Sequence, residues 1–110
     1  MAHSLSILNV LGSVQRALLG NVTPNLRAVD VLIKDEKNLE LIFYYDKEMS
    51  KNEEELPSLT ETEVASDFPE PDYHVTGVVK VLSYPARVPQ DGFLAYLRHE
   101  EKEHEEKELE

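Results

Sequence analysis

Two histidines near the C-terminal end lie in a charged string with some likeness to a zinc-protease motif. The string is His99-Glu-Glu-Lys-Glu-His104, so its histidines are five positions apart. The zinc motif needs a spacing of four, about 40° around a helix, so that both imidazoles face one metal ion. A spacing of five turns them roughly 140° apart. The spacing therefore excludes the protease motif, and we predict no metal site.

Carboxylates are the most abundant candidates for acid–base chemistry. They concentrate in one segment, as Glu53, Glu54, Glu55, Glu61 and Glu63. A catalytic carboxylate needs burial or an apolar pocket that shifts its pKa. Adjacent glutamates on a surface helix point around its axis and stay hydrated. We therefore predict no catalytic residue among them.

His74 is the only histidine inside the predicted fold, and it shares a strand face with Thr76 and Lys80. A lone histidine with neither a cysteine nor a serine elbow is usually structural. The chain has no cysteine, and its four glycines are too scattered for a phosphate-binding loop. These patterns predict a protein that is not an enzyme and holds no cofactor; a small hydrolase is the remaining enzymatic alternative.

The net charge of the chain indicates which classes of partner it can bind. The chain of 110 residues carries 22 acidic and 11 basic side chains, a net charge of −11. That balance disfavours nucleic acid and anionic membranes as partners. Residues 46–72 hold ten acids against two bases, and the final residues are also acidic. The excess favours a basic protein partner, although acidity also serves solubility alone.

Periodic apolar residues define six elements. Residues 5–19 have the apolar spacing of an amphipathic helix, which Gly20 can end. Alternating residues in 26–34 and 38–46 predict two strands of an antiparallel hairpin. Residues 73–84 and 93–98 read as two further strands. The second helix covers 50–68, where Ser50 to Glu53 and Ser58 to Glu61 resemble capping boxes. Pro57 implies either a kink in that helix or a separate first turn.

The resulting order, α-β-β-α-β-β, predicts an α+β fold with one mostly antiparallel four-stranded sheet and two helices packed on it. Apolar residues of the hairpin should form the core: Val29, Val31, Ile33, Leu39, Leu41 and Phe43. Residues 1–98 form one domain on this interpretation, and 99–110 form an acidic solvated tail. No apolar run suits a membrane span or a secretory signal, so we expect a cytoplasmic protein.

Tyrosines suggest where a partner would bind. Neighbouring residues of a strand point to opposite faces, so of Tyr44 and Tyr45 one should be core and the other more exposed. An exposed ring beside carboxylates suits an interface, because the ring supplies contact area and the charges steer association. The predicted partner-binding residues are Tyr44, Tyr45, Asp46, Glu48, Glu53, Glu54, Glu55 and Glu61.

Several blocks of sequence resemble a family of short acidic bacterial proteins. The blocks are RALLGNVTPNLRAV (16–29), FYYD (43–46), ETEVASDFPE (61–70), LSYP (82–85) and LAYLRHE (94–100). Members are known mainly as hypothetical proteins and are associated with toxin–immunity neighbourhoods. The resemblance covers residues 16–100 and carries no catalytic motif. It implies an immunity protein.

The charge pattern and the resemblance together favour a small acidic module that caps a basic partner, such as a nuclease toxin. A nuclease presents a cationic groove to phosphates, and an acidic helix can occupy that groove. The alternative is an adaptor that forms homodimers through a sheet edge, since the strand 73–84 would leave its edge open unless paired.

Overall fold

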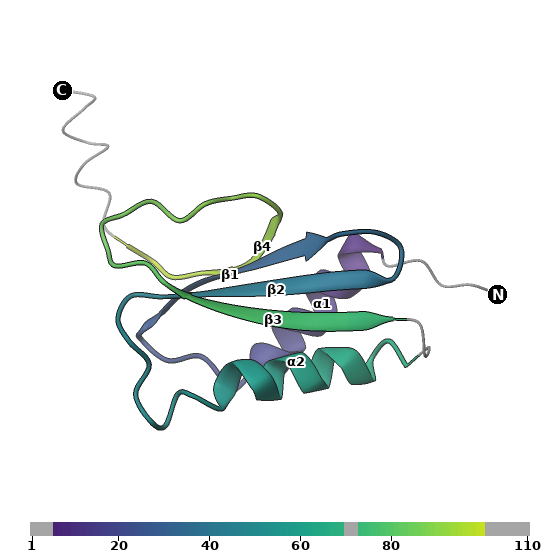
Figure 1. The fold of residues 1–110 in the computed structure, drawn as a ribbon, viewed down its shortest axis with the longest axis horizontal. Coiled ribbons are helices and arrows are strands. Elements are labelled where there is room, and N and C mark those ends of the chain that lie inside the picture. The colour runs from purple at the N-terminus through teal and green to yellow at the C-terminus, as the bar shows by residue number, and fades with distance from the viewer. Residues whose placement is uncertain (1–5, 70–72, 101–110) are drawn as a thin grey trace.

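Six elements form one layer of helices on one sheet, in the computed structural model that describes residues 6–69 and 73–100 (Figure 1). They are α1 (Ile7–Leu18), β1 (Leu26–Ile33), β2 (Asn38–Tyr45), α2 (Leu56–Ser66), β3 (His74–Val81) and β4 (Phe93–Leu97). The predicted α-β-β-α-β-β order is confirmed. In the described part of the chain, no helix is long and apolar enough to cross a membrane.

The helix α1 forms because its apolar residues recur on one face. Val10, Val14 and Leu18 are buried there against the sheet. After the helix, Gly20 has a positive φ of 81°, which glycine adopts without the strain of a side chain. Ser13 and Arg16 both bind Asp67, just past the end of α2, at 2.6 and 3.1 Å. These bonds tie the two helices together.

A tight turn joins β1 to β2 in the predicted antiparallel hairpin. Asp35 organises this turn, because one carboxylate oxygen accepts the backbone N–H groups of Lys37 and Asn38 at 2.8 and 3.0 Å. The hairpin register pairs Val29 with Phe43 and so brings apolar residues onto one face. Their pairing fixes which residues meet the helices.

The predicted four-stranded, mostly antiparallel sheet is confirmed, and one pair of its strands is parallel. The sheet order is β3-β2-β1-β4, and β3 runs parallel to β2 while the other two pairs are antiparallel. The reason is α2, which carries the chain from the end of β2 back toward its beginning. A crossover helix of this kind joins parallel strands, whereas a short hairpin cannot. The sheet is thus mostly antiparallel, with a parallel pair at one edge.

The second helix begins at Leu56, with Pro57 in its first turn, and follows separate turns at 51–55. Of the two alternatives at Pro57, the separate first turn is therefore confirmed. Neither serine caps α2 itself. Glu53 nevertheless accepts the backbone N–H of Ser50 at 2.9 Å, which is half of the predicted capping box.

The sheet buries both of its faces. The helix face carries Val29, Val31, Leu39, Leu41 and Phe43, which are buried against α1 and α2, with Ile33 partly buried at the margin. All six predicted core residues thus pack there. The outer face carries Ala28, Ile42 and Tyr44, and it is covered by Leu82 and Val88 from the connection between β3 and β4. This connection gives the protein a second, smaller core.

Candidate partner-binding surface

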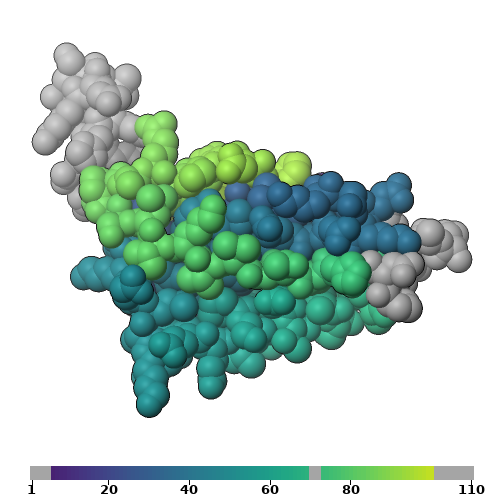
Figure 2. Space-filling model, viewed as in Figure 1, coloured from purple at the N-terminus to yellow at the C-terminus, as the bar shows by residue number. Residues whose placement is uncertain are grey.

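The eight predicted binding residues lie along the end of β2, the turns after it and α2, but they play three different structural roles. Two are buried aromatics, two are acids used within the fold, and four are acids turned toward solvent. Figure 2 shows that α2 and the turns before it form one side of the molecule, in teal.

Tyr44 and Tyr45 point to opposite faces, as the alternation of a strand requires, yet both are buried. Their exposed fractions are 3 % and 1 %. Tyr45 packs beneath the helices, where burial raises its pKa to about 12. The ring of Tyr44 lies under the connection after β3, where burial and then the charge of Asp30 raise its pKa. The expectation that one of them is exposed is wrong, because both faces of the sheet are covered.

The exposed tyrosine beside acid is Tyr84, which is 39 % exposed. Its backbone N–H donates to Asp46 at 2.9 Å, and its ring lies 5.9 Å from the guanidinium carbon of Arg27. That arrangement is a cation–π contact. Tyr84 thus has the property that the sequence analysis assigned to Tyr44 or Tyr45.

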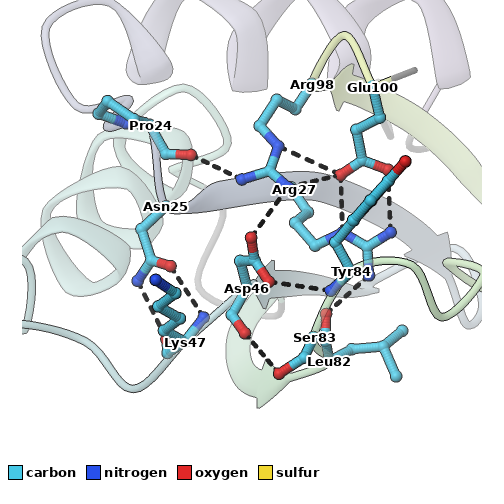
Figure 3. A network of polar contacts seen from close by, with 10 residues as sticks. All are labelled: Pro24, Asn25, Arg27, Asp46, Lys47, Leu82, Ser83, Tyr84, Arg98 and Glu100. Atoms are coloured by element: carbon cyan, nitrogen blue, oxygen red, sulfur yellow. Dashed lines mark hydrogen bonds and ion pairs between the residues drawn. The ribbon is translucent and has the colours of Figure 1, made fainter.

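Asp46 belongs to a polar network and is not a free surface charge (Figure 3). Beside its bond from Tyr84, it accepts a hydrogen bond from Arg98 at 3.1 Å. Its backbone carbonyl accepts the hydroxyl of Ser83 at 2.8 Å. The N–H of Tyr84 first, and then Arg98, hold the pKa of Asp46 below its usual value. Asp46 therefore joins the end of β2 to the segment after β3.

Arg27, Arg98 and Glu100 form the other half of this network (Figure 3). Arg27 is 2 % exposed and binds Glu100 through two hydrogen bonds of 2.8 and 2.9 Å. A third N–H of Arg27 donates to the carbonyl of Leu82 at 2.6 Å. Arg98 also donates to Glu100, at 2.8 and 3.1 Å. These contacts bring Glu100 into the fold, two residues beyond the domain boundary expected at residue 98.

One feature of the sequence is consistent with this network, although the pattern does not identify the partners. Arg27 is a charge within an apolar strand, and a buried charge needs a partner. The identity of the partner, 73 positions away, depends on the sheet order. The rest of the predicted tail, 101–110, lies outside the described residues.

Glu53 is buried and anchors the turns that precede α2. Its carboxylate accepts hydrogen bonds from the Thr23 hydroxyl, the backbone of Ser50 and the amide of Asn25. The Thr23 hydroxyl is the main cause that lowers its pKa. Asn25 also binds the backbone of Lys47 in both directions, at 2.8 and 3.0 Å. Glu53 and Asn25 thus hold the connection against the segment before β1.

Four predicted acids remain in contact with solvent. Glu48, Glu54 and Glu55 are exposed, and Glu61 is half-buried on α2. No lysine or arginine occurs within α2. We call Glu48, Glu54, Glu55 and Glu61 the acidic surface. Glu54 and Glu55 directly follow Glu53, which is hydrogen-bonded to Thr23 and Asn25, and Glu48 follows Lys47, whose backbone Asn25 binds, so these three charges lie next to anchored backbone.

The candidate catalytic groups do not converge. His74 is exposed at the start of β3, and His99 is exposed two residues after the end of β4. Within residues 6–69 and 73–100, no group of three histidine or carboxylate side chains could hold a metal ion. The other histidine of the charged string, His104, lies outside the described residues.

Comparison with known proteins and families shows which family the chain belongs to. Among curated proteins no sequence matches it. The sequence profile described as MafI2 immunity protein matches residues 8–100, which include α2, all four strands and all of α1 except Ile7. This match spans most of the chain and agrees with the resemblance to proteins of toxin–immunity neighbourhoods. The chain therefore belongs to the MafI2 immunity protein family, and its role is that of an immunity protein whose partner is a toxin.

Proposed function

We propose that this protein neutralises a basic toxin, of the nuclease class, by covering the toxin's cationic site with the acidic surface. The observation that carries the proposal is the difference between two sets of acids in one segment. Asp46, Glu53 and Asp67 are hydrogen-bonded within the fold. Glu48, Glu54 and Glu55 are exposed. Folding leaves the second set available to a partner.

A nuclease toxin suits such a surface for a physical reason. Its active site must attract phosphates and therefore carries positive potential. Carboxylates next to anchored backbone can occupy the same site, and long-range attraction accelerates the encounter. On this proposal the protein acts by binding and not by catalysis. Because a nuclease toxin acts where nucleic acid is, we propose the cytoplasm as its location.

The test is charge reversal with a matched control. Glu54→Lys with Glu55→Lys should lower the association rate with the cognate toxin by about tenfold or more at low salt. The control is Glu36→Lys with Asp91→Lys, which makes the same change in net charge at exposed sites. Glu36 lies beyond the opposite end of β2 from Glu54 and Glu55, about 25 Å away by the rise of that strand. Asp91 precedes Gly92, whose N–H donates to Asp30 on the outer face of the sheet.

Ionic strength separates steering from lost contacts. The Debye length is about 10 Å at 0.1 M salt and about 3 Å at 1 M, so the difference between the two double variants should nearly vanish at high salt. Surface plasmon resonance against the immobilised toxin measures both rates. Equal association rates for the two double variants at low salt would refute the acidic surface as the binding site.

A further inference from the structure

Among the strands of the described residues, none pairs with the outer edge of β3. β3 is the last strand in the sheet order, and its residues pair with those of β2 one to one without a bulge. The N–H groups of His74 and Leu82 donate to carbonyls of the β2 side, at 2.8 Å each. Since successive residues of a strand alternate in direction, the N–H groups of the odd-numbered residues point away from β2. These residues are Val75, Gly77, Val79 and Val81.

This edge has only one of the usual protections, a single lysine. Natural proteins protect exposed edges with lysine and other charges, proline, bulges or very short strands. β3 is eight residues long, contains no proline, and has Lys80 as its one lysine or acidic residue. Val79 and Val81 are 38 % and 44 % exposed on the helix face of this edge. Figure 2 shows β3, in green, at the surface with α2 along one side.

A carboxylate lies beside the middle of this edge. A Cβ atom at Gly77 would approach Oε2 of Glu61 to 2.8 Å, so the side chain of Glu61 occupies the space that a residue larger than glycine would fill. Glu61 is half-buried, and no hydrogen bond or ion pair with another described residue engages it. The edge therefore combines outward backbone groups, two apolar side chains and one negative charge.

We propose that an extended basic segment of the toxin pairs with β3 as a fifth strand. The odd-numbered backbone groups of β3 would bind the segment, a lysine or arginine would pair with Glu61, and an apolar residue would cover Val79 and Val81. Strand addition of this kind takes affinity from backbone hydrogen bonds and specificity from alternate side chains. The inference rests on the proposed function and names the part of the toxin that binds.

Charge argues against a second copy of this chain on the same edge. Two copies that paired β3 with β3 about a two-fold axis would form one continuous sheet with both α2 helices on the same side, next to each other. Each α2 carries Glu61 and Glu63 and no basic residue. Like charges placed side by side are unfavourable. A basic toxin segment makes the opposite, attractive contact.

Residue-resolved hydrogen exchange on the complex tests the inference. The probe is the cognate toxin, identified as the protein whose toxicity this chain neutralises. In the complex, the amides of Val75, Gly77, Val79 and Val81 should exchange at least about tenfold more slowly than in the free protein. Thr76, Val78 and Lys80 already face β2, so their amides should change little. A complex that leaves the four outward amides unprotected refutes strand addition while the proposed function stands; failure to form any complex refutes both.

Two pairs of variants provide an independent readout. Val79→Pro removes one outward N–H, which an edge strand tolerates, whereas Val79→Thr keeps it. We expect Val79→Pro to weaken toxin binding about tenfold or more at an unchanged melting temperature, and Val79→Thr to bind normally. Glu61→Gln should also weaken binding several-fold. Its control is Glu63→Gln, two residues on and therefore about 160° away around α2.

Each outcome of this set decides the proposal. Loss of affinity in Val79→Pro and Glu61→Gln, with normal binding in both controls, supports the fifth strand. If Val79→Pro does not fold, Glu61→Gln and the exchange data still decide the outcome. Protection of the outward amides that rises with protein concentration in the absence of toxin would assign the edge to a second copy and overturn the inference.

Discussion

Arg27 and Glu100 lie 73 positions apart and are joined by two hydrogen bonds of 2.8 and 2.9 Å. The pair fastens Glu100, three residues after the end of β4, to the buried Arg27 near the start of β1. Glu100 also binds Arg98, and Arg98 binds Asp46 at the end of β2. Through these two arginines, Glu100 connects the segment after β4 to β1 and to the end of β2.

Removing the charge of Glu100 should destabilise the protein, because it leaves the buried guanidinium of Arg27 without its partner. We expect Glu100→Gln to cost about 2–3 kcal/mol, less than for a fully buried pair because Glu100 is partly exposed. Urea unfolding measures the loss. The control is Glu40→Gln, which breaks a surface pair with Lys34 at 3.9 Å and should cost less than about 1 kcal/mol. Equal losses in the two variants would contradict the structural role of Glu100.

Acid should weaken the fold through the same carboxylates. Hydrogen bonds from Arg27, from the N–H of Tyr84 and from Thr23 lower the pKa values of Glu100, Asp46 and Glu53 respectively. In the unfolded chain these groups return to ordinary pKa values of 4.5 for glutamate and 3.8 for aspartate. Between the folded and unfolded values the unfolded chain binds more protons.

The stabilisation from these three groups is therefore complete above about pH 4.5 and is lost as the pH falls through the lowered values. Urea midpoints measured on either side of that pH should show the decline. The Glu100→Gln variant should show a shallower decline, since it lacks one of the titrating groups. A midpoint independent of pH throughout this range would count against the network.

Both neighbouring tyrosines should support the folded monomer, since each fills a separate core. We expect Tyr44→Ala and Tyr45→Ala each to cost about 3–5 kcal/mol, the usual range for removing a large buried ring. The control is the half-exposed Tyr84, where Tyr84→Ala should cost clearly less. Chemical denaturation of the isolated protein compares the three. A stable Tyr44→Ala variant would mean that the connection after β3 does not cover the outer face in solution.

The neighbouring residues Glu53 and Glu54 should differ in how much each contributes to the stability of the fold. Glu53 is buried with three hydrogen-bond partners, so we expect Glu53→Gln to cost about 1–3 kcal/mol of unfolding free energy. Glu54 is exposed, and Glu54→Gln should change stability by less than about 0.5 kcal/mol. Thermal melts measure both. The reverse order would show that the turns before α2 are arranged differently.

Replacing Gly92 and Gly12 by alanine should change the stability of the protein in opposite directions. A Cβ atom at Gly92 would lie 2.2 Å from the carbonyl oxygen of Val31, so Gly92→Ala must push β4 away from β1. We expect a loss of more than about 2 kcal/mol, from overpacking and broken strand pairing. At Gly12, within α1, the nearest atom is the flexible end of Arg16 at 3.5 Å. Gly12→Ala should stabilise the protein by about 0.5–1 kcal/mol, because alanine favours a helix.

The sequence alone predicted the elements and the class of the fold, because their signals are local. The apolar stripe of α1, the alternation in β1 and β2, and the turn at Asp35 depend on residues within a few positions of one another. The same local reasoning identified all six residues that pack on the helix face. It also located the excess of acid and, through the resemblance, the immunity family that the profile match then confirmed.

Tertiary structure decided which of these residues are available to a partner. Tyr44 and Tyr45 alternate as a strand requires, but their burial depends on what covers each face, and the outer face is covered by a connection some 40 residues further along the chain. Glu53 and Glu54 are indistinguishable in the sequence, yet only Glu53 meets Thr23 and Asn25. Strand order likewise made β3 an edge and placed Glu61 over Gly77. Exposure and pairing depend on contacts distant in sequence, and local patterns do not contain that information.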